Sequence, residues 1–88
     1  VPEWFGRYYD YGTGWLYHVE HGWMYWTGIP GYSIWLWSAA RGWLWTGDTL
    51  YPFLWSATSN TWLWYYRPTG NGAGGWFYNY ATGRTEWR

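Results

Sequence analysis

The strongest constraint on this chain is an alternation of aliphatic and aromatic side chains that recurs along its 88 residues. In the stretch SIWLWSAARGWLWTGD, residues 33–48, tryptophan stands at every second position of two short runs, with Leu between the tryptophans and Ile34 before the first. Successive side chains of a strand point to opposite faces of a sheet. The pattern therefore predicts strands that have one aliphatic face and one aromatic face.

The pattern recurs as two short aromatic runs around a small polar turn. Leu16, Leu36, Leu54 and Phe77 hold equivalent places in the first run of each unit, at intervals of 20, 18 and 23 residues. Such runs, bounded by Gly, Ser, Asn and Thr, are typical of β-hairpins. The predicted tryptophan-rich hairpins are 15–26, 34–46, 52–66 and 76–87.

These units predict an all-β fold, an antiparallel meander of about eight short strands, rolled in a barrel-like or solenoid-like way. All of it belongs to a single domain, 1–88, in which residues 1–14 supply a leading strand. No helical period is present, so we expect a chain without helices. The Gly- and Pro-containing segments reverse the chain, and GNGAGG, 70–75, is interpreted as a flexible connector. The predicted reversals are TGIPG, TGDTLYP and RPTGNGAGG.

Alternation divides the strand residues into two sets, and it leaves open which set is enclosed and whether the sheet closes. One set is mostly aliphatic: Leu16, Met24, Ile34, Leu36, Leu44, Leu54, Leu63 and Phe77. The other is aromatic: Trp15, Tyr17, Trp23, Tyr25, Trp35, Trp37, Trp43, Trp45, Phe53, Trp55, Trp62, Trp64, Trp76, Tyr78 and Tyr80. A chain of this size encloses one core, so part of this apolar area is expected to form an interaction surface.

The charge content limits the classes of partner that the protein can bind, and the cysteine content limits how its fold is stabilised. Five arginines balance five acidic residues and lysine is absent, which favours association over repulsion. The scattered arginines provide no electrostatic track for nucleic acid, and we expect them to contact aromatic rings or carboxylates of neighbouring molecules. Without cysteine, no disulfide stabilises the fold.

The sequence offers little for catalysis, and we expect neither an enzyme nor a cofactor. The acidic residues are scattered, and the serines lie near turns without a histidine partner. GNGAGG lacks the lysine of a phosphate-binding loop. HVEH, 18–21, holds two histidines whose opposite parity predicts opposite faces, so no metal site is expected there.

The ends of the sequence suggest export. The chain starts at Val1, and we expect a mature protein with ordered ends, outside the cell or on its surface, from which a signal peptide has been removed. It contains no apolar run near 18 residues, so no membrane span is expected.

Four motifs cover nearly the whole chain: WFG, the GW-Y pairs, the LWT–TYP-like segment and the closing WFYNYATG. In their order the sequence resembles the Trp/Tyr-rich modules at the C-terminal ends of large secreted proteins of environmental Gram-negative bacteria. That resemblance implies an extracellular fold unit and carries no assigned activity. The hairpin spacing also resembles, less specifically, the repeats of choline- and glucan-binding cell-wall modules, which hold ligands in aromatic cages between successive hairpins.

Two functions follow as expectations. The first is a secreted structural protein that self-assembles through its aromatic face into a homopolymeric filament or appendage. Its expected subunit contacts are Trp23, Trp26, Trp35, Trp43, Trp62 and Tyr66. The alternative is a carbohydrate- or cell-wall-binding module with glycans as partners, in which Trp and Tyr stack on sugars. Its hydroxyl-binding residues are expected to be Asp48, Asn60 or Asn79.

Overall fold

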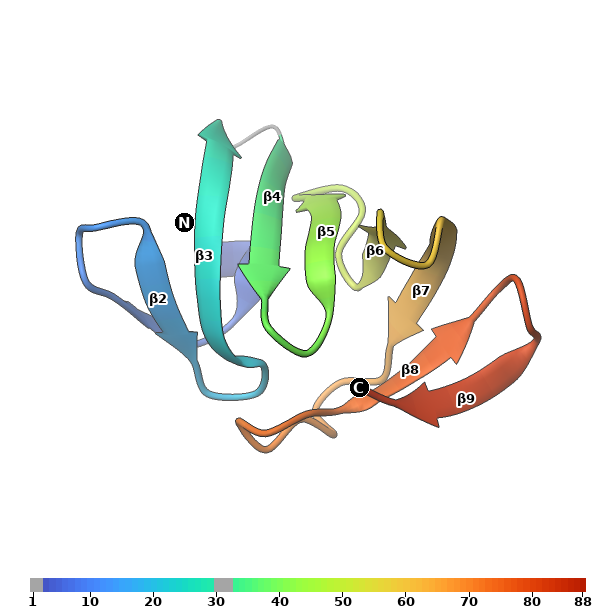
Figure 1. Cartoon of the computed structure of the whole chain (residues 1–88). Helices are drawn as coiled ribbons and strands as arrows, with labels where there is room; N and C mark the ends of the chain where they lie inside the picture. Colours follow the sequence, from blue (N-terminus) through green and yellow to red (C-terminus); the bar gives the residue numbers. More distant parts are fainter. Residues whose placement is uncertain (1–2, 30–32) are drawn as a thin grey trace.

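The computed structural model describes residues 3–29 and 33–88, whose strands form one antiparallel sheet ordered as in the sequence (Figure 1). The strands are β1 (Tyr8–Asp10), β2 (Trp15–His18), β3 (Gly22–Ile29), β4 (Ser33–Ser38), β5 (Gly42–Gly47), β6 (Phe53–Ser56), β7 (Thr61–Tyr65), β8 (Trp76–Asn79) and β9 (Arg84–Trp87). The predicted all-β meander is confirmed. The sheet is open, with β1 and β9 as its edges, so the barrel-like closure is not observed.

The four predicted hairpins are the pairs β2–β3, β4–β5, β6–β7 and β8–β9. The leading segment is less extended than predicted, because a single 3-10 turn, η1 (Glu3–Phe5), precedes the short β1. The expected order at Val1 and part of the TGIPG reversal lie outside the described residues. In the described part of the chain, no helix has the length and hydropathy that a membrane crossing requires.

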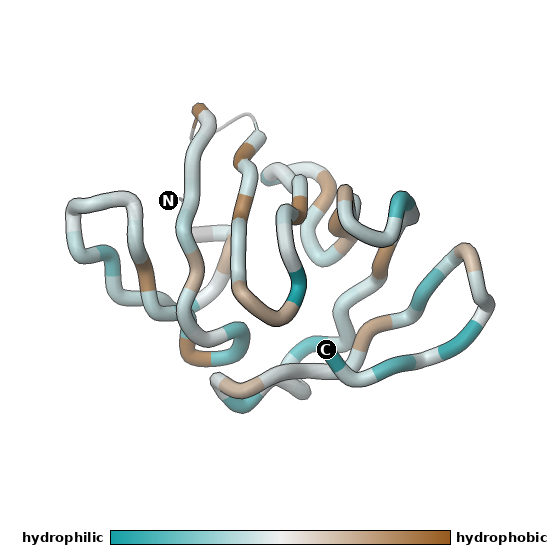
Figure 2. The backbone as a smooth tube through the Cα atoms, in the orientation of Figure 1, coloured by the Kyte–Doolittle hydropathy of each residue, from teal (hydrophilic) through white to brown (hydrophobic). Residues whose placement is uncertain are grey.

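The aliphatic set lines the inside of the curved sheet and forms the core. All eight of its members are at most 1% exposed, and Phe5 and Tyr65 join them. Leu16 pairs across strands with Met24, and Leu36 with Leu44, so neighbouring strands bring their aliphatic side chains together. Figure 2 shows these brown positions recurring from strand to strand. The question that alternation left open is answered: the aliphatic face is the enclosed one.

Each hairpin turn begins at a buried polar residue that ends the first strand of the pair. Ser56 Oγ accepts a hydrogen bond from Ser59 N at 3.1 Å, and Asn79 Oδ1 accepts from Ala81 N at 2.8 Å. Such bonds satisfy turn N–H groups that would otherwise lack a partner. The four equivalent residues are His18, Ser38, Ser56 and Asn79. The internal repeat therefore includes its turns as well as its strands.

The glycine-rich segment 70–75 packs against the turn between β2 and β3. Gly72 N donates to Glu20 O at 2.9 Å, and Tyr65 Oη donates to Glu20 Oε1 at 2.5 Å. Gly70 N in turn donates to Tyr65 Oη at 2.7 Å. Figure 1 shows this segment, before β8, beneath the β2–β3 turn. The prediction of a flexible connector is wrong: the segment, called the latch below, joins the third and first hairpins.

Three of the five arginines make side-chain contacts within the chain. Arg41 is only 4% exposed; it donates to His21 O at 3.0 Å and to Arg88 O at 3.1 Å. The Arg67 guanidinium lies 5.1 Å from the centre of the Tyr51 ring, and Arg88 pairs with Glu86 at 2.6 Å. For these three arginines, contacts with backbone carbonyls, a ring and a carboxylate occur within the molecule; arginine contacts with neighbouring molecules stay a prediction.

Candidate interaction surface

The outward face of the sheet is a nearly continuous layer of aromatic rings. No outward position of the described strands carries a charged residue, and the few non-aromatic ones are Thr27, Ile29, Ser33, Gly47 and Thr85. We call this layer the ring face. Its members are Tyr9, Trp15, Tyr17, Trp23, Tyr25, Trp35, Trp37, Trp43, Trp45, Phe53, Trp55, Trp62, Trp64, Trp76, Tyr78 and Trp87.

Rings of this face pack edge to face on one another. Trp35 and Trp43 are 6.4 Å apart between centroids with planes at 84°, and Trp15 and Trp37 are 6.1 Å apart at 79°. This geometry sets the positive edge of one ring against the negative face of another and contributes about 0.5–1.5 kcal/mol per pair. The ring face is therefore a packed layer with a defined shape.

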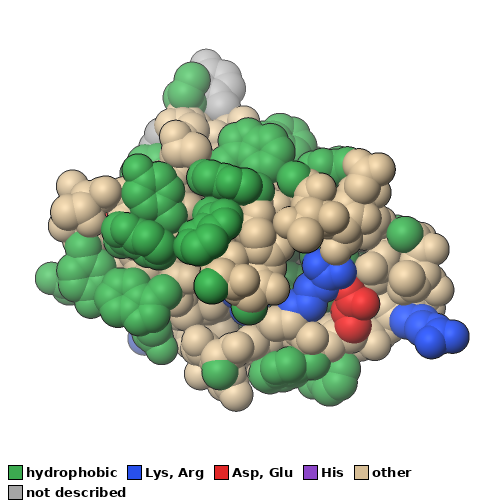
Figure 3. All heavy atoms as spheres, viewed as in Figure 1, with side chains coloured by type: hydrophobic (Ala, Val, Ile, Leu, Met, Phe, Trp, Pro, Cys, Tyr) green, Lys and Arg blue, Asp and Glu red, His purple; other side chains and the backbone are tan. Residues whose placement is uncertain are grey.

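The outer side of this layer remains accessible to solvent. Trp23 is 55% exposed, and Trp35 and Trp43 are 37% and 39% exposed. Figure 3 shows hydrophobic side chains gathered over the part of the molecule where β2 to β5 lie. With roughly 100 Å² left open on each of about ten rings, the accessible apolar area is on the order of 1,000 Å². That exceeds the ~300–600 Å² typical of a monomer's largest patch and matches the ~800 Å² that one partner buries in a standard interface.

The structure places five of the six expected contact residues on the outward side. Trp23, Trp35, Trp43 and Tyr66 are exposed, while Trp62 is half-buried between Trp45 and Trp55.

Trp26 differs from the other five expected contacts. It pairs with Leu36 on β4 and packs against the core, so it lies on the inner side of the sheet. Its indole Nε1 is buried with no hydrogen-bond partner among the described residues.

Hollows open between the rings of the outward layer. One of about 370 Å³ is lined by Thr27, Trp35, Trp43 and Ala57. Another, of about 380 Å³, is lined by Leu50, Phe53, Trp62 and Tyr80. Both have apolar walls, so they fit apolar or ring-shaped groups of a partner.

The two histidines lie together in the core, and the prediction that they point to opposite faces is wrong. Their ring centroids are 4.5 Å apart, beneath the ring of Phe5. His18 Nε2 donates to Phe5 O at 2.7 Å, and its Nδ1 accepts from Glu20 N at 3.0 Å. His21 belongs to the turn, where alternation no longer applies, and its Nε2 is 2.8 Å from Tyr51 Oη.

Burial disfavours the charged form of both rings. It lowers the pKa of His18, and it lowers the pKa of His21 well below the usual range, with the nearby His18 and Arg41 acting in the same direction. Within the described residues, no group of three His, Cys, Asp or Glu side chains is arranged to hold a metal ion. The pair is therefore best described as a neutral part of the core.

The expected hydroxyl-binding residues are dispersed. Asp48 and Asn60 are exposed in different turns. Asn79 is 5% exposed; besides accepting from its turn, its Nδ2 donates to Glu86 Oε1 at 3.2 Å. The structure does not bring these three side chains together around one ring.

Sequence reasoning missed two inward tyrosines: Tyr65, which is fully buried and bonds Gly70 of the latch, and the partly buried Tyr51, which packs against the core. Burial and the hydrogen bond to Glu20 raise the pKa of Tyr65 to about 12, and burial also raises the pKa of Tyr51. Tyr65 shares the strand parity of Leu63, which was the available signal. Tyr51 lies in a loop and carried no such signal.

Comparison with known proteins adds no relative: no protein-family model, no curated protein and no solved structure matches this chain.

Proposed function

We propose that this protein is an extracellular structural protein that self-associates through its ring face into a filament. The observation that carries the proposal is the uncharged, accessible aromatic layer, whose area is of the same order as the ~800 Å² that one partner buries in a standard interface. Half-exposed Trp and Tyr are the side chains that contribute most to such contacts. A second copy presents the same kind of surface.

The curvature of the sheet favours several neighbours over one. The rings lie on the outside of a sheet that bends around its core, and the body measures 36 × 25 × 21 Å. A single rigid partner touches only part of a convex surface, so covering the ring face takes contacts on more than one side. A contact between different parts of the surface that does not close on itself produces a filament.

The charge balance supports the same proposal. The formal net charge is zero at pH 7, and no lysine is present to keep copies apart. The buried Arg41 and the Arg88–Glu86 pair are already engaged within the molecule. Attraction between ring faces therefore meets little long-range repulsion.

The test adds charge to the ring face without removing a ring. Thr27 and Ala57 are exposed and line one hollow, so the Thr27→Lys/Ala57→Lys variant places two cations among the tryptophans. We expect wild type to sediment as large assemblies that electron microscopy resolves as filaments. The variant is expected to remain monomeric, because burying an unpaired ammonium is costly.

The matched control is Thr13→Lys/Ala81→Lys, which makes the same replacements at exposed loop positions away from the strands. It should assemble like wild type, and circular dichroism should show the same fold for both variants. Wild-type protein that stays monomeric at high concentration would contradict the proposal, as would equal loss of assembly in both variants. Detection of the protein in the medium of producing cells tests its extracellular location.

A further inference from the structure

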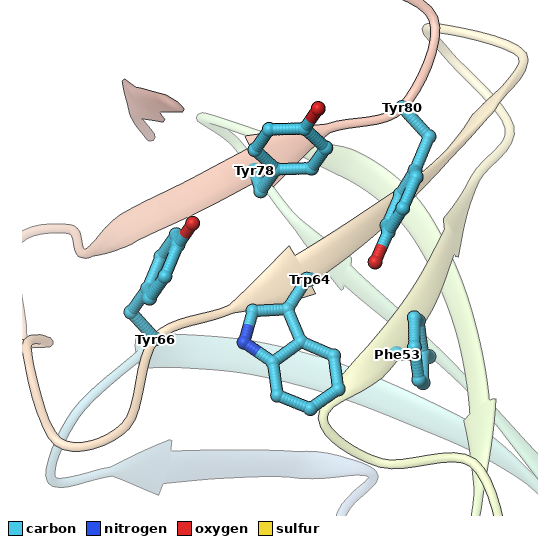
Figure 4. Close-up of a pocket in the computed structure, with 5 residues that line it drawn as sticks. All are labelled: Phe53, Trp64, Tyr66, Tyr78 and Tyr80. Carbon is cyan, nitrogen blue, oxygen red and sulfur yellow. The ribbon is translucent and has the colours of Figure 1, made fainter. Parts of the chain in front are cut away.

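A third hollow of the outward face has a different character from the two described above. It measures about 370 Å³ and is lined by Phe53, Trp64, Tyr66, Tyr78 and Tyr80, which come from β6, β7, β8 and the segments that follow β7 and β8. Trp64 and Tyr78 are a cross-strand pair. In Figure 4 they lie between Tyr66 on one side and Tyr80 with Phe53 on the other. We call these five residues the tyrosine box.

Two neighbouring pairs of rings in the tyrosine box stand nearly perpendicular. The planes of Phe53 and Trp64 meet at 76° with centroids 4.6 Å apart, and those of Tyr78 and Tyr80 meet at 78° with centroids 4.9 Å apart. Perpendicular rings form a floor and side walls rather than one flat platform. Such a box suits a compact ring-shaped ligand that presents C–H groups to aromatic faces.

The hydroxyl groups of the tyrosine box have no hydrogen-bond partner within the described protein. By contrast, the hydroxyl groups of the buried tyrosines are engaged: Tyr51 Oη lies 2.8 Å from His21 Nε2, and Tyr65 Oη bonds Glu20 and Gly70 N. Three free phenol groups around one hollow match a ligand that both donates and accepts hydrogen bonds. A quaternary ammonium group does neither.

None of the described residues that line the tyrosine box is charged. The nearest arginine in sequence, Arg67, directs its guanidinium to Tyr51, at 5.1 Å from the ring centre. The box therefore offers no opposite charge to a phosphate, a carboxylate or an ammonium; its aromatic faces can attract a cation, which is why a cationic probe is included in the test below. An uncharged ligand enters it without leaving an ion unpaired.

The tyrosine box adjoins the hollow lined by Leu50, Phe53, Trp62 and Tyr80, because the two share Phe53 and Tyr80. The rings of this shared pair are 6.0 Å apart between centroids with planes at 33°. Two hollows on either side of one pair of rings can accept two consecutive units of a chain. The two hollows together are lined by aromatic rings and carry no charge, and the tyrosine box supplies the free hydroxyl groups.

We propose that the tyrosine box and the adjoining hollow bind two consecutive sugar units of a neutral glycan. The sugar C–H faces stack on the rings, while the sugar hydroxyl groups bond Tyr66, Tyr78 and Tyr80. This site overlaps the ring face, because Phe53, Trp64 and Tyr78 belong to both. Sugar binding nevertheless needs no second copy of the chain, so a variant that does not assemble should still bind sugar, and failure of one proposal leaves the other open to its own test.

The experiment titrates the Thr27→Lys/Ala57→Lys protein with cellohexaose and with maltohexaose, following tryptophan fluorescence and calorimetric heat. Its two lysines lie outside both hollows, and the assembly state is checked by light scattering. We expect at least one hexasaccharide to bind. A Tyr66→Phe/Tyr78→Phe/Tyr80→Phe variant, which keeps all rings, should bind it at least tenfold more weakly, because three hydrogen bonds are lost.

The matched control is Tyr9→Phe/Tyr17→Phe/Tyr25→Phe, which removes three hydroxyl groups from the ring face far along the sheet. It should bind like its parent. Choline chloride serves as a third probe: binding of choline without either hexasaccharide would assign the box to a cation and overturn the proposal. Absence of binding by both hexasaccharides, or equal weakening in the two Phe variants, would overturn it as well.

Discussion

The inner and outer faces of this sheet are built by the same strands and differ in almost every physical respect. Inside, aliphatic side chains are at most 1% exposed, and the buried His18 and Asn79 are hydrogen-bonded. Outside, rings rest on rings and stay partly open, with no charge among the strand positions. The comparison shows that one alternating pattern can encode a core and an interaction surface together.

Space decides which set lies inside. A strongly curved sheet leaves limited room on its inner side, which the mostly aliphatic set fills together with Phe5 and Tyr65 at the density of a protein interior. The many rings of the other set are too large to share that volume, because overpacking a core is destabilising. The outer side imposes no such limit, since neighbouring rings there only have to pack edge to face.

The largest expected effect compares two neighbours on β3 that face opposite ways. Met24 is 1% exposed and Trp23 is 55% exposed. Met24→Ala should reduce the free energy of unfolding by about 2–5 kcal/mol, because it leaves a cavity in the core. Trp23→Thr should cost less than half as much. Urea unfolding followed by far-UV circular dichroism measures both, and equal losses would break the distinction between the faces.

The next effect tests whether the latch holds the inner side in place. Gly22 has φ +81°, and a Cβ there would meet Gly72 O of the latch. Gly12 has φ +77° with nothing near the Cβ position. Gly22→Ala should therefore cost at least about 2 kcal/mol, against about 1 kcal/mol of backbone strain for Gly12→Ala. Thermal unfolding compares them, and similar losses would show that the latch is dispensable.

A smaller effect concerns low pH, which we expect to destabilise the fold through the two histidines on the inner side of the sheet. The folded state lowers the pKa of His18 and His21, so the unfolded chain takes up protons first as the pH falls. Stability should be constant above about pH 7 and decline below about pH 6.5, by about 1.4 kcal/mol per unit of pKa difference for each ring.

Denaturant unfolding at intervals between pH 8 and pH 5 measures this dependence. NMR titration of the two imidazoles is a second test, because each ring of the folded protein should remain neutral at pH values below the usual pKa of histidine. A flat stability profile down to pH 5 would contradict the assignment of the pair to the core. The outward strand positions hold no histidine, so the ring face is expected to be unaffected in the folded protein.

The smallest effect concerns a single turn. Ser56→Ala removes the acceptor for Ser59 N, and it should cost about 1 kcal/mol in denaturant unfolding. Ser59→Ala is the control, because it keeps the N–H that donates to Ser56. Among the described residues, the Ser59 hydroxyl accepts a single hydrogen bond, from Arg88 Nη2 at 2.9 Å on the surface. If both replacements cost the same, the capping role of Ser56 fails.

The strands and the enclosed aliphatic set were predictable because side-chain alternation is a local rule. The rule places Leu36, Leu44 and Leu54 on one face wherever strands pair in register. The same rule predicts an inward side chain for Trp26, because Trp26 lies two residues after the inward Met24 on the same strand. The expectation of Trp26 as an outward contact did not apply the rule that the rest of the prediction followed.

What the sequence did not reveal depends on contacts distant along the chain. His21 follows the end of a strand, so parity could not orient its ring. The glycines of the latch indicated flexibility by composition, whereas their small size permits close approach: a Cβ at Gly70 would meet Glu20 O. The tyrosine box draws on β6, β7 and β8 together, and no local pattern marked its free hydroxyl groups.

The latch has a consequence for how the chain unfolds. A meander of hairpins makes mostly near-neighbour contacts, so its repeats can in principle melt one after another, as in solenoid proteins. The bonds from Gly72 and Tyr65 to Glu20 join the first hairpin to the last third of the chain. They couple the melting of distant repeats, turning a row of separable units into one cooperative transition.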